Sequence, residues 1–132
     1  MSWPDRRIAT VALVVPDYDE AANWYVDRLG FQRAEDVDLG GGKRWLKVAA
    51  GNSGVELLLA KAEGESQQAR VGDQTGGRVF LFLETDDFAR DHAAMLAKGV
   101  AFKEEPRREA YGTVAVFADL YGNLWDLIEP KR

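Results

Sequence analysis

The fold is decided by the stretch Ile8–Gly30, IATVALVVPDYDEAANWYVDRLG. Its beginning, Ile8–Val15, is apolar, rich in β-branched residues and short for a helix, which predicts a buried strand. Asp17 and Glu20 then have the spacing of a capping box, and Gly30 stands where a glycine commonly ends a helix. The stretch therefore predicts a strand followed by a helix that ends near Gly30.

The next segments predict antiparallel strands. The run Gly40–Gly42 is a hairpin connection, and Gly51–Gly54 is a turn between the expected strands Arg44–Ala50 and Val55–Ala60. Together with the opening strand and helix, these elements make a β-α-β-β-β module over about residues 7–61. The segment 62–77 is polar and has no apolar periodicity, so we expect a linker or mobile loop there.

The pattern then occurs a second time, over about residues 78–130. The expected elements are a strand at Val79–Leu83, a helix at Phe88–Lys98, and strands at Thr113–Ala118 and Leu124–Ile128. A shift of 70 residues places Asp17 on Asp87 and Glu56 on Asp126. This internal repeat predicts one α+β domain over residues 1–132, in which two tandem β-α-β-β-β modules form a cupped, eight-stranded mixed sheet.

Composition excludes several classes of function. The chain has 132 residues, 46% of them hydrophobic, and a formal net charge of −5, which disfavours a nucleic-acid partner. It has no cysteine, so disulfides, thiolate zinc sites and a cysteine nucleophile are excluded. No run approaches the ~20 apolar residues of a membrane span, and no leader segment is evident at the start. We therefore expect a cytoplasmic, soluble protein that does not bind membranes.

Two stretches of the chain resemble a known family. Val11–Phe31 (VALVVPDYDEAANWYVDRLGF) is similar to the opening strand and helix of the vicinal oxygen chelate superfamily, and Val114–Pro130 (VAVFADLYGNLWDLIEP) is similar to its closing hairpin. That superfamily includes glyoxalase I, extradiol dioxygenases and bleomycin-resistance proteins. The resemblance covers nearly the whole chain and implies the glyoxalase-like fold and a homodimer.

The resemblance also locates four positions at which enzymatic members hold a metal with two histidines and two glutamates. Here the histidine positions are Thr10 and Phe80, while the acidic positions keep Glu56 and Asp126. Transition-metal sites of this kind need imidazole, and Phe80 has no lone pair to donate. We therefore expect no metal and no other cofactor. Glu56 and Asp126 remain candidates for acid–base catalysis, with an ion pair to a neighbouring Arg or Lys as the structural alternative for each.

The other candidate site residues are aromatic. Strand alternation places Phe80 and Phe82 on the same side as Thr10, and Trp45 and Tyr111 lie on or beside strands. Aromatic faces together with carboxylates suit a flat or cationic organic ligand. The alternative for each aromatic residue is ordinary core packing. The expected ligand-binding set is Thr10, Trp45, Glu56, Phe80, Phe82, Tyr111 and Asp126.

Three functions follow as hypotheses. The leading one is a metal-independent protein that binds a small molecule, cationic or aromatic and drug-like, as bleomycin-resistance proteins do. The alternative is a divergent glyoxalase-like lyase, isomerase or dioxygenase that uses Glu56 and Asp126. The third is an interaction domain with a filled cup. Whether the protein is an enzyme stays open at this point.

Two other segments are expected at the surface. His92 is the one histidine, and we expect it to be exposed on its helix while Ala93 and Leu96 pack. The stretch 103–109 alternates basic and acidic residues, which predicts a solvated loop. Arg107 and Arg108 are candidates there for contact with an anion.

Overall fold

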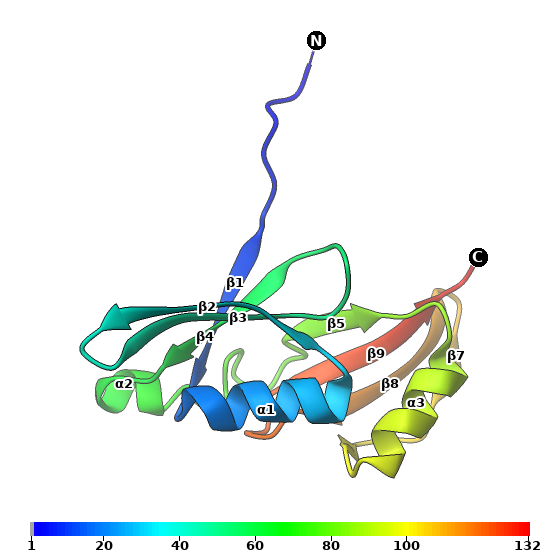
Figure 1. Ribbon diagram of the computed structural model, residues 1–132. Coiled ribbons are helices and arrows are strands. Elements are labelled where there is room, and N and C mark those ends of the chain that lie inside the picture. Colours follow the sequence, from blue (N-terminus) through cyan, green and yellow to red (C-terminus); the bar gives the residue numbers. More distant parts are fainter. Residues whose placement is uncertain (1) are drawn as a thin grey trace.

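The computed structural model describes residues 2–132, an α+β domain built from two modules (Figure 1). The first module contains β1 (Thr10–Val15), α1 (Tyr18–Leu29), β2 (Gln32–Gly40), β3 (Lys43–Ala49) and β4 (Glu56–Lys61). Its four strands have the order β1-β4-β3-β2, with β1 parallel to β4 and the other neighbours antiparallel. The predicted β-α-β-β-β module is confirmed.

The predicted boundaries of α1 are also confirmed. The side chain of Asp17 accepts a hydrogen bond of 2.8 Å from the backbone N–H of Glu20. Gly30 ends the helix with a φ of 73°, a left-handed conformation that glycine adopts without a steric cost. In the second module Asp87 caps its helix in the same way, by accepting from the backbone N–H of Arg90.

The second module repeats the element order of the first, except that one of its strands is divided. It contains β5 (Leu81–Glu84), α3 (Phe88–Ala97), β6 (Ala101–Phe102), β7 (Arg107–Glu109), β8 (Gly112–Ala118) and β9 (Leu124–Pro130). These strands form a five-stranded sheet of order β5-β9-β8-β6, with β7 also paired to β8. The strand before β8 is thus divided in two, and Pro106, which has no N–H to donate, lies in the gap.

Two segments that the sequence predicts to be loops contain short elements of secondary structure. β7 lies in the stretch that was expected to be a loop, because the short pairing with β8 overrides its charged composition. The linker 62–77 contains the short helix α2 (Gly64–Gln68) and is tied to both modules. Gln74 accepts a hydrogen bond from the backbone N–H of Val14 on β1, and its own backbone N–H donates to Asn123.

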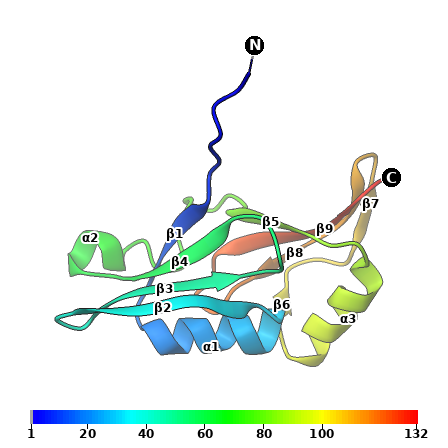
Figure 2. The same ribbon diagram turned by 45° about the horizontal axis from the view of Figure 1, so that its top comes forward.

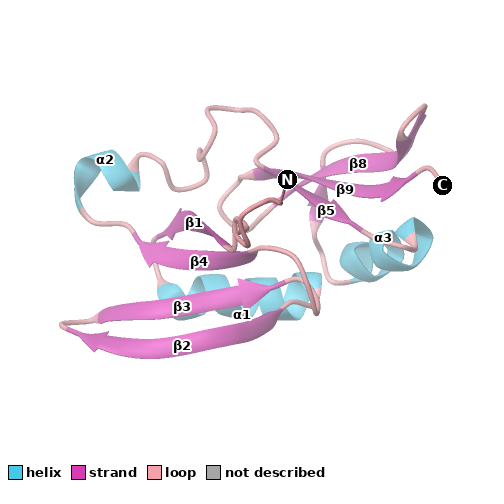
Figure 3. Ribbon diagram, turned by 90° about the horizontal axis from the view of Figure 1, so that it is seen from above, coloured by secondary structure: helices cyan, strands magenta, loops and turns pink. Residues whose placement is uncertain are grey.

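The strands form one layer and the helices the other. Figure 1 shows α1 and α3 on the lower side of the molecule, and Figure 3 shows the two sheets side by side when seen from above. A single buried core joins the modules. At its centre the ring of Trp125 lies 5.9 Å from that of Tyr25 and 5.8 Å from that of Phe117, measured between centroids.

A buried carboxylate fastens the modules to each other. Asp119, in the turn between β8 and β9, accepts a hydrogen bond of 2.6 Å from the hydroxyl of Tyr25 on α1. It also accepts from the side chain of Asn123 and from the backbone N–H groups of Tyr121, Gly122 and Asn123. Burial, followed by the charge of Asp119, raises the pKa of Tyr25 well above its usual value. The hydroxyl therefore stays protonated and donates.

Residues 2–9 form an arm that points away from the body, hereafter the N-terminal arm (Figure 2). All of its residues are exposed, including Trp3 (91%) and Ile8 (77%). Across residues 2–132, none of the helices combines the length and apolarity that a membrane crossing requires.

Candidate functional site

The candidate site lies on the sheet faces that point away from α1 and α3, which we call the open faces. Alternation along the strands decides which side chains reach them: Leu13, Val15, Leu57 and Leu59 pack in the core, so their neighbours point the other way. On the first sheet the open face carries Thr10, Glu35, Val37, Trp45, Lys47 and Glu56. On the second it carries Phe82, Glu84, Val114, Val116, Asp126 and Ile128.

On the first sheet the acid is paired. The ammonium of Lys47 lies 2.7 Å from a carboxylate oxygen of Glu56 and 3.4 Å from one of Glu35. The indole N–H of Trp45 donates to Glu35 at 2.9 Å, and the Lys47 ammonium lies 5.8 Å from the Trp45 ring centroid. Hydrogen bonding to Glu56 is the main reason that the pKa of Lys47 is raised. Of the two alternatives for Glu56, the structure therefore shows the ion pair with a neighbouring lysine.

On the second sheet the acid is unpaired. Asp126 is 8% exposed, and its Oδ1 atom is buried without a hydrogen-bond partner among the described residues. The nearby Arg107 is engaged elsewhere, by Glu104 at 2.9 Å and by Glu109 at 2.8 Å. Burial raises the pKa of Asp126, and it outweighs the opposing effect of Arg107. A buried carboxylate of this kind gains from any cationic group that reaches it.

The two sheets use different registers. Thr10 is the strand partner of Glu56, as the repeat suggests, but the partner of Asp126 is Phe82. The amide of Phe80 instead donates to the carbonyl of Leu124. A shift of two residues keeps each side chain on its face while moving it along the strand, so a constant offset of 70 could not reveal it.

The aromatic candidates therefore do not lie together on one face. Phe80 is partly buried and packs against the core cluster, whereas Phe82 is 62% exposed beside Asp126. Trp45 lies on the open face of the first sheet, and the half-exposed Tyr111 lies in the turn between β7 and β8. Strand alternation did not separate Phe80 from Phe82, because Phe80 precedes β5 rather than belonging to it.

The donor set does not fit a transition metal. Thr10 and Phe80 supply no imidazole or carboxylate at the two positions where the resemblance implies histidines, and Glu56 is already bound by Lys47. Within residues 2–132 no group of three or more His, Cys, Asp and Glu side chains is placed to hold an ion.

His92 packs against two aromatic rings, so the expectation that it is exposed on its helix is wrong. Its ring stacks on Phe88 with centroids 5.2 Å apart and meets the edge of Phe102 at 4.5 Å. Leu96 is half-exposed and Met95 is buried instead, so the apolar face of α3 is rotated relative to the one expected. Of the two arginines expected to contact an anion, Arg107 holds two glutamates and Arg108 is exposed.

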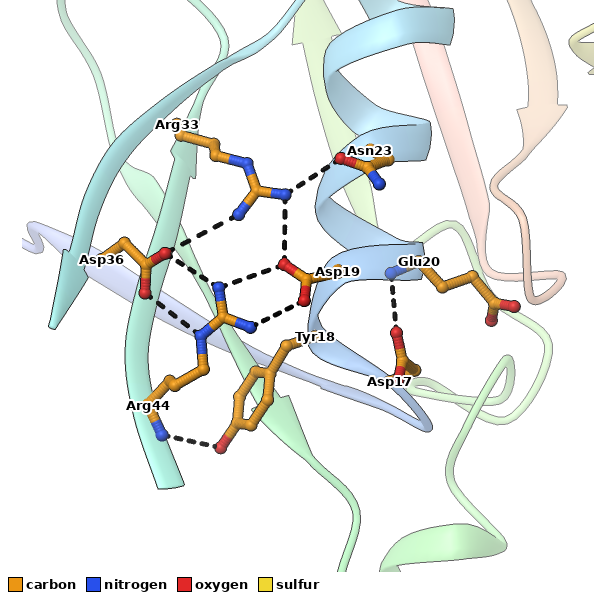
Figure 4. Close-up of polar contacts among 8 residues, drawn as sticks. All are labelled: Asp17, Tyr18, Asp19, Glu20, Asn23, Arg33, Asp36 and Arg44. Atoms are coloured by element: carbon orange, nitrogen blue, oxygen red, sulfur yellow. Dashed lines mark hydrogen bonds and ion pairs between the residues drawn. The ribbon is translucent and has the colours of Figure 1, made fainter. Parts of the chain in front are cut away.

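A second polar cluster lies on the helix side and is structural. The guanidinium of Arg44 on β3 bonds both Asp19 and Asp36, and it lies 5.3 Å from the Tyr18 ring centroid (Figure 4). Arg33 on β2 bonds Asp19 as well. Hydrogen bonding to Arg44 is the main cause of the lowered pKa of Asp19 and Asp36. These contacts fasten the β2–β3 hairpin to α1.

Two clefts lie along the boundary of the modules. One, of about 510 Å³, is lined by the ends of α1 and β5, the β3–β4 turn and α3. The other, of about 440 Å³, lies between the β3–β4 hairpin and β5, and we call it the module groove. Its wall is mainly apolar and includes Phe31, Val55, Leu57, Leu81, Phe82 and Trp125. Neither cleft is lined by Glu56 or Asp126.

Comparison with known proteins gives consistent matches. Residues 7–127 match the Glyoxalase/Bleomycin resistance protein/Dioxygenase superfamily. An uncharacterized protein of Shewanella frigidimarina is 52% identical over 94% of this chain and 93% of its own. The crystal structure of UcmS2 is 30% identical with a TM-score of 0.81, over 94% of this chain and 98% of its own. That of TnmS3, an antibiotic binding protein from Streptomyces sp. CB03234, is 28% identical with a TM-score of 0.79, over 98% and 100%.

Proposed function

Because the chain belongs to the Glyoxalase/Bleomycin resistance protein/Dioxygenase superfamily, we propose that it binds and sequesters a small cationic aromatic molecule without a metal. The observation that carries the proposal is the buried, unpaired carboxylate of Asp126 beside the exposed ring of Phe82. A ring stacked on Phe82 would bring a positive substituent to Asp126, which no side chain among residues 2–132 pairs.

The charge of both open faces favours the same ligand. On the open face of the first sheet Lys47 lies between two glutamates. Beside the open face of the second sheet Arg107, the strand partner of Val114, also lies between two glutamates, so each group has one net negative charge. Asp126 adds another. Aromatic surface next to net negative charge attracts planar cations and repels planar anions. The structural similarity to TnmS3, an antibiotic binding protein, supports a drug-like ligand.

We further propose that the binding unit is a homodimer. In one chain the open faces lie side by side in separate sheets, and the aromatic side chains Trp45 and Phe82 remain exposed. A site that buries most of a ligand needs a second wall. The open face of a second copy would supply it.

The test uses two planar probes of opposite charge, proflavine as the cation and fluorescein as the anion. We expect quenching of tryptophan fluorescence and a measurable Kd for proflavine, with fluorescein at least ten times weaker. Asp126→Asn should weaken proflavine binding by about 10- to 100-fold, the range for loss of a charged hydrogen bond. Glu56→Gln, the matched control, should have a smaller effect because Lys47 already engages Glu56. No response to proflavine or to a broad panel of basic aromatic compounds would refute the proposal.

The enzyme alternative has one observation in its favour. A carboxyl group with a raised pKa can deliver and recover a proton, and Asp126 is such a group. Mass spectrometry of a bound compound after long incubation in D₂O separates the two functions. An unchanged mass supports sequestration, whereas incorporated deuterium or a new product that disappears in Asp126→Asn supports catalysis.

A further inference from the structure

Four side chains on the open face of the second sheet form a square with two acidic and two apolar corners. The register of β5 and β9 pairs Phe82 with Asp126. Two residues further along, it pairs Glu84 with Ile128, and residues two apart on a strand point to the same face. Phe82 and Ile128 therefore lie on one diagonal. Asp126 and Glu84 lie on the other. We call these four residues the β5–β9 square.

Glu84 is the corner of the square that the proposed function does not use. It is exposed at the end of β5, and no Lys or Arg of residues 2–132 lies within salt-bridge distance of its carboxylate. The next acid along the chain, Asp86, is held instead by Arg90 of α3 at 2.9 Å. Together with Asp126, whose buried Oδ1 has no partner, Glu84 gives the square two carboxylates that lack a countercharge.

On the other side of Asp126, away from β5, the charges are already paired. Arg107 of β7 bonds Glu104 at 2.9 Å and Glu109 at 2.8 Å. Burial is the main reason that the pKa of Asp126 is raised, while the charge of Arg107 lowers that pKa and the charge of Glu104 raises it. A cationic group is therefore repelled by Arg107 on this side, whereas the square itself contains no basic residue.

The square is accessible, and the spacing of its two acids suits one small molecule. Neighbouring strands lie about 4.8 Å apart and two residues span about 6.7 Å, so roughly 8 Å separates the Cα atoms of Asp126 and Glu84. β5 is the terminal strand of its sheet, on the side that faces the first module (Figure 3). Phe82 is 62% exposed, and both Phe82 and Glu84 line the module groove of about 440 Å³, which leaves room for the substituents of a ligand.

We propose that the preferred ligand is a flat dication that lies across the β5–β9 square. One positive group contacts Asp126, the other contacts Glu84, and the rings between them cover the two apolar corners. A dication neutralises both carboxylates, whereas a monocation at Asp126 leaves Glu84 without a partner. This inference rests on the proposed function, and it names Glu84 as the residue that selects doubly charged ligands.

Two probes of the same shape test the proposal by isothermal titration calorimetry. Methyl viologen has two aromatic rings and two positive nitrogens about 7 Å apart, close to the roughly 8 Å between the two acids. Its counterpart, para-phenyl-N-methylpyridinium, has the same two rings and one positive nitrogen. We expect the wild type to bind methyl viologen at least about fivefold more tightly. About twofold comes from the two orientations of a symmetric dication, and the rest comes from the ion pair with the exposed Glu84.

Two variants show whether this ratio of affinities depends on Glu84. Glu84→Gln should reduce it to about twofold, because only the two orientations then favour the dication. Asp86→Asn is the matched control. It removes the same charge two residues away, from a carboxylate that Arg90 already holds, and it should keep the wild-type ratio. Both side chains are exposed, so both variants should melt close to the wild type, which a thermal melt checks.

Four outcomes would overturn the inference. They are a wild-type ratio of twofold or less; a ratio that Glu84→Gln leaves unchanged; an equal fall in Glu84→Gln and Asp86→Asn, which would reflect net charge rather than a contact; and binding of proflavine without binding of either probe. Each of these leaves the proposed function standing wherever proflavine still binds. Failure of proflavine and of both probes to bind would refute the proposed function itself, and this inference with it.

Discussion

Each module carries a carboxylate in the strand that comes last in its sequence, β4 or β9, but the surroundings of the two carboxylates differ. Glu56 faces Ala49 across the hairpin, and Asp126 faces Val116. Two residues earlier on those partner strands stand Lys47 and Val114. Lys47 reaches Glu56, whereas Val114 leaves Asp126 without a countercharge. One position on a hairpin thus separates a paired strand acid from a candidate ligand anchor.

The connecting turns differ as well. In the first module the β3–β4 turn, Gly51–Gly54, is exposed, while the corresponding β8–β9 turn contains the buried Asp119 and Asn123. The second module therefore supplies both the inter-module fastening and the unpaired acid. A repeat can keep one architecture while its two copies take different tasks.

The largest expected effect tests this difference between turns. Asp119→Ala removes the acceptor for Tyr25 and for three backbone N–H groups, and we expect it to lower the free energy of unfolding by about 3 kcal/mol. Asn52→Ala, in the corresponding turn of the first module, should change it by less than about 0.5 kcal/mol. Urea denaturation followed by circular dichroism measures both. If Asp119→Ala does not fold, Asp119→Asn should still fall well below the wild type, and equal effects in the two turns would remove the distinction.

The second prediction is that neutralising the two acids changes the free energy of unfolding in opposite directions. Asp126→Asn removes a buried unpaired charge and should raise the free energy of unfolding by about 1 kcal/mol at pH 7, while Glu56→Gln loses an ion pair and should lower it. Because the folded-state pKa of Asp126 is raised, protonation favours the folded wild type. The advantage of Asp126→Asn should therefore shrink as the pH falls through that raised pKa. Thermal unfolding at a series of pH values measures it, and a constant or growing advantage in acid would contradict the assignment.

A third, smaller effect compares the helix caps. Asp17→Ala should lower the free energy of unfolding by about 1 kcal/mol, the usual cost of losing an N-cap. Asp87→Ala should cost about half as much, because Glu129 also accepts a hydrogen bond from the first turn of α3, at the amide of Phe88. Thermal melts of the two variants decide it, and a larger loss for Asp87→Ala would show that Glu129 gives no support.

The smallest expected effect makes the first module resemble the second. Lys47→Met frees Glu56 and Glu35 on the open face and should strengthen proflavine binding about threefold, in the range of an exposed ion-pair interaction. Arg44→Met, on the helix side of the same strand, is the matched control and should leave binding unchanged. Weaker binding in Lys47→Met would mean that the lysine contributes to the ligand site rather than screening it.

Sequence predicted those parts of the molecule that depend on local spacing. The cap at Asp17, the hairpin at Gly40–Gly42 and the repeat itself are set by neighbouring residues and occur where expected. The register of β5 against β9 depends on packing between distant segments, so the partner of Asp126 was not predicted. For Glu56 an ion pair with a neighbouring Arg or Lys is only one of two alternatives from sequence, because a strand pattern does not show which side chain on the next strand contacts the carboxylate.

The bond between Tyr25 and Asp119 also bears on how the protein is made. Its partners are 94 positions apart, and the acceptor lies near the end of the chain. During synthesis the N-terminal module emerges first, and its own contacts already hold the first helix, through the Asp17 cap and the bonds of Arg33 and Arg44 to Asp19. The bond to Asp119 forms only after the turn between β8 and β9 has left the ribosome, so this fastening between the modules is among the last contacts of the fold to be made.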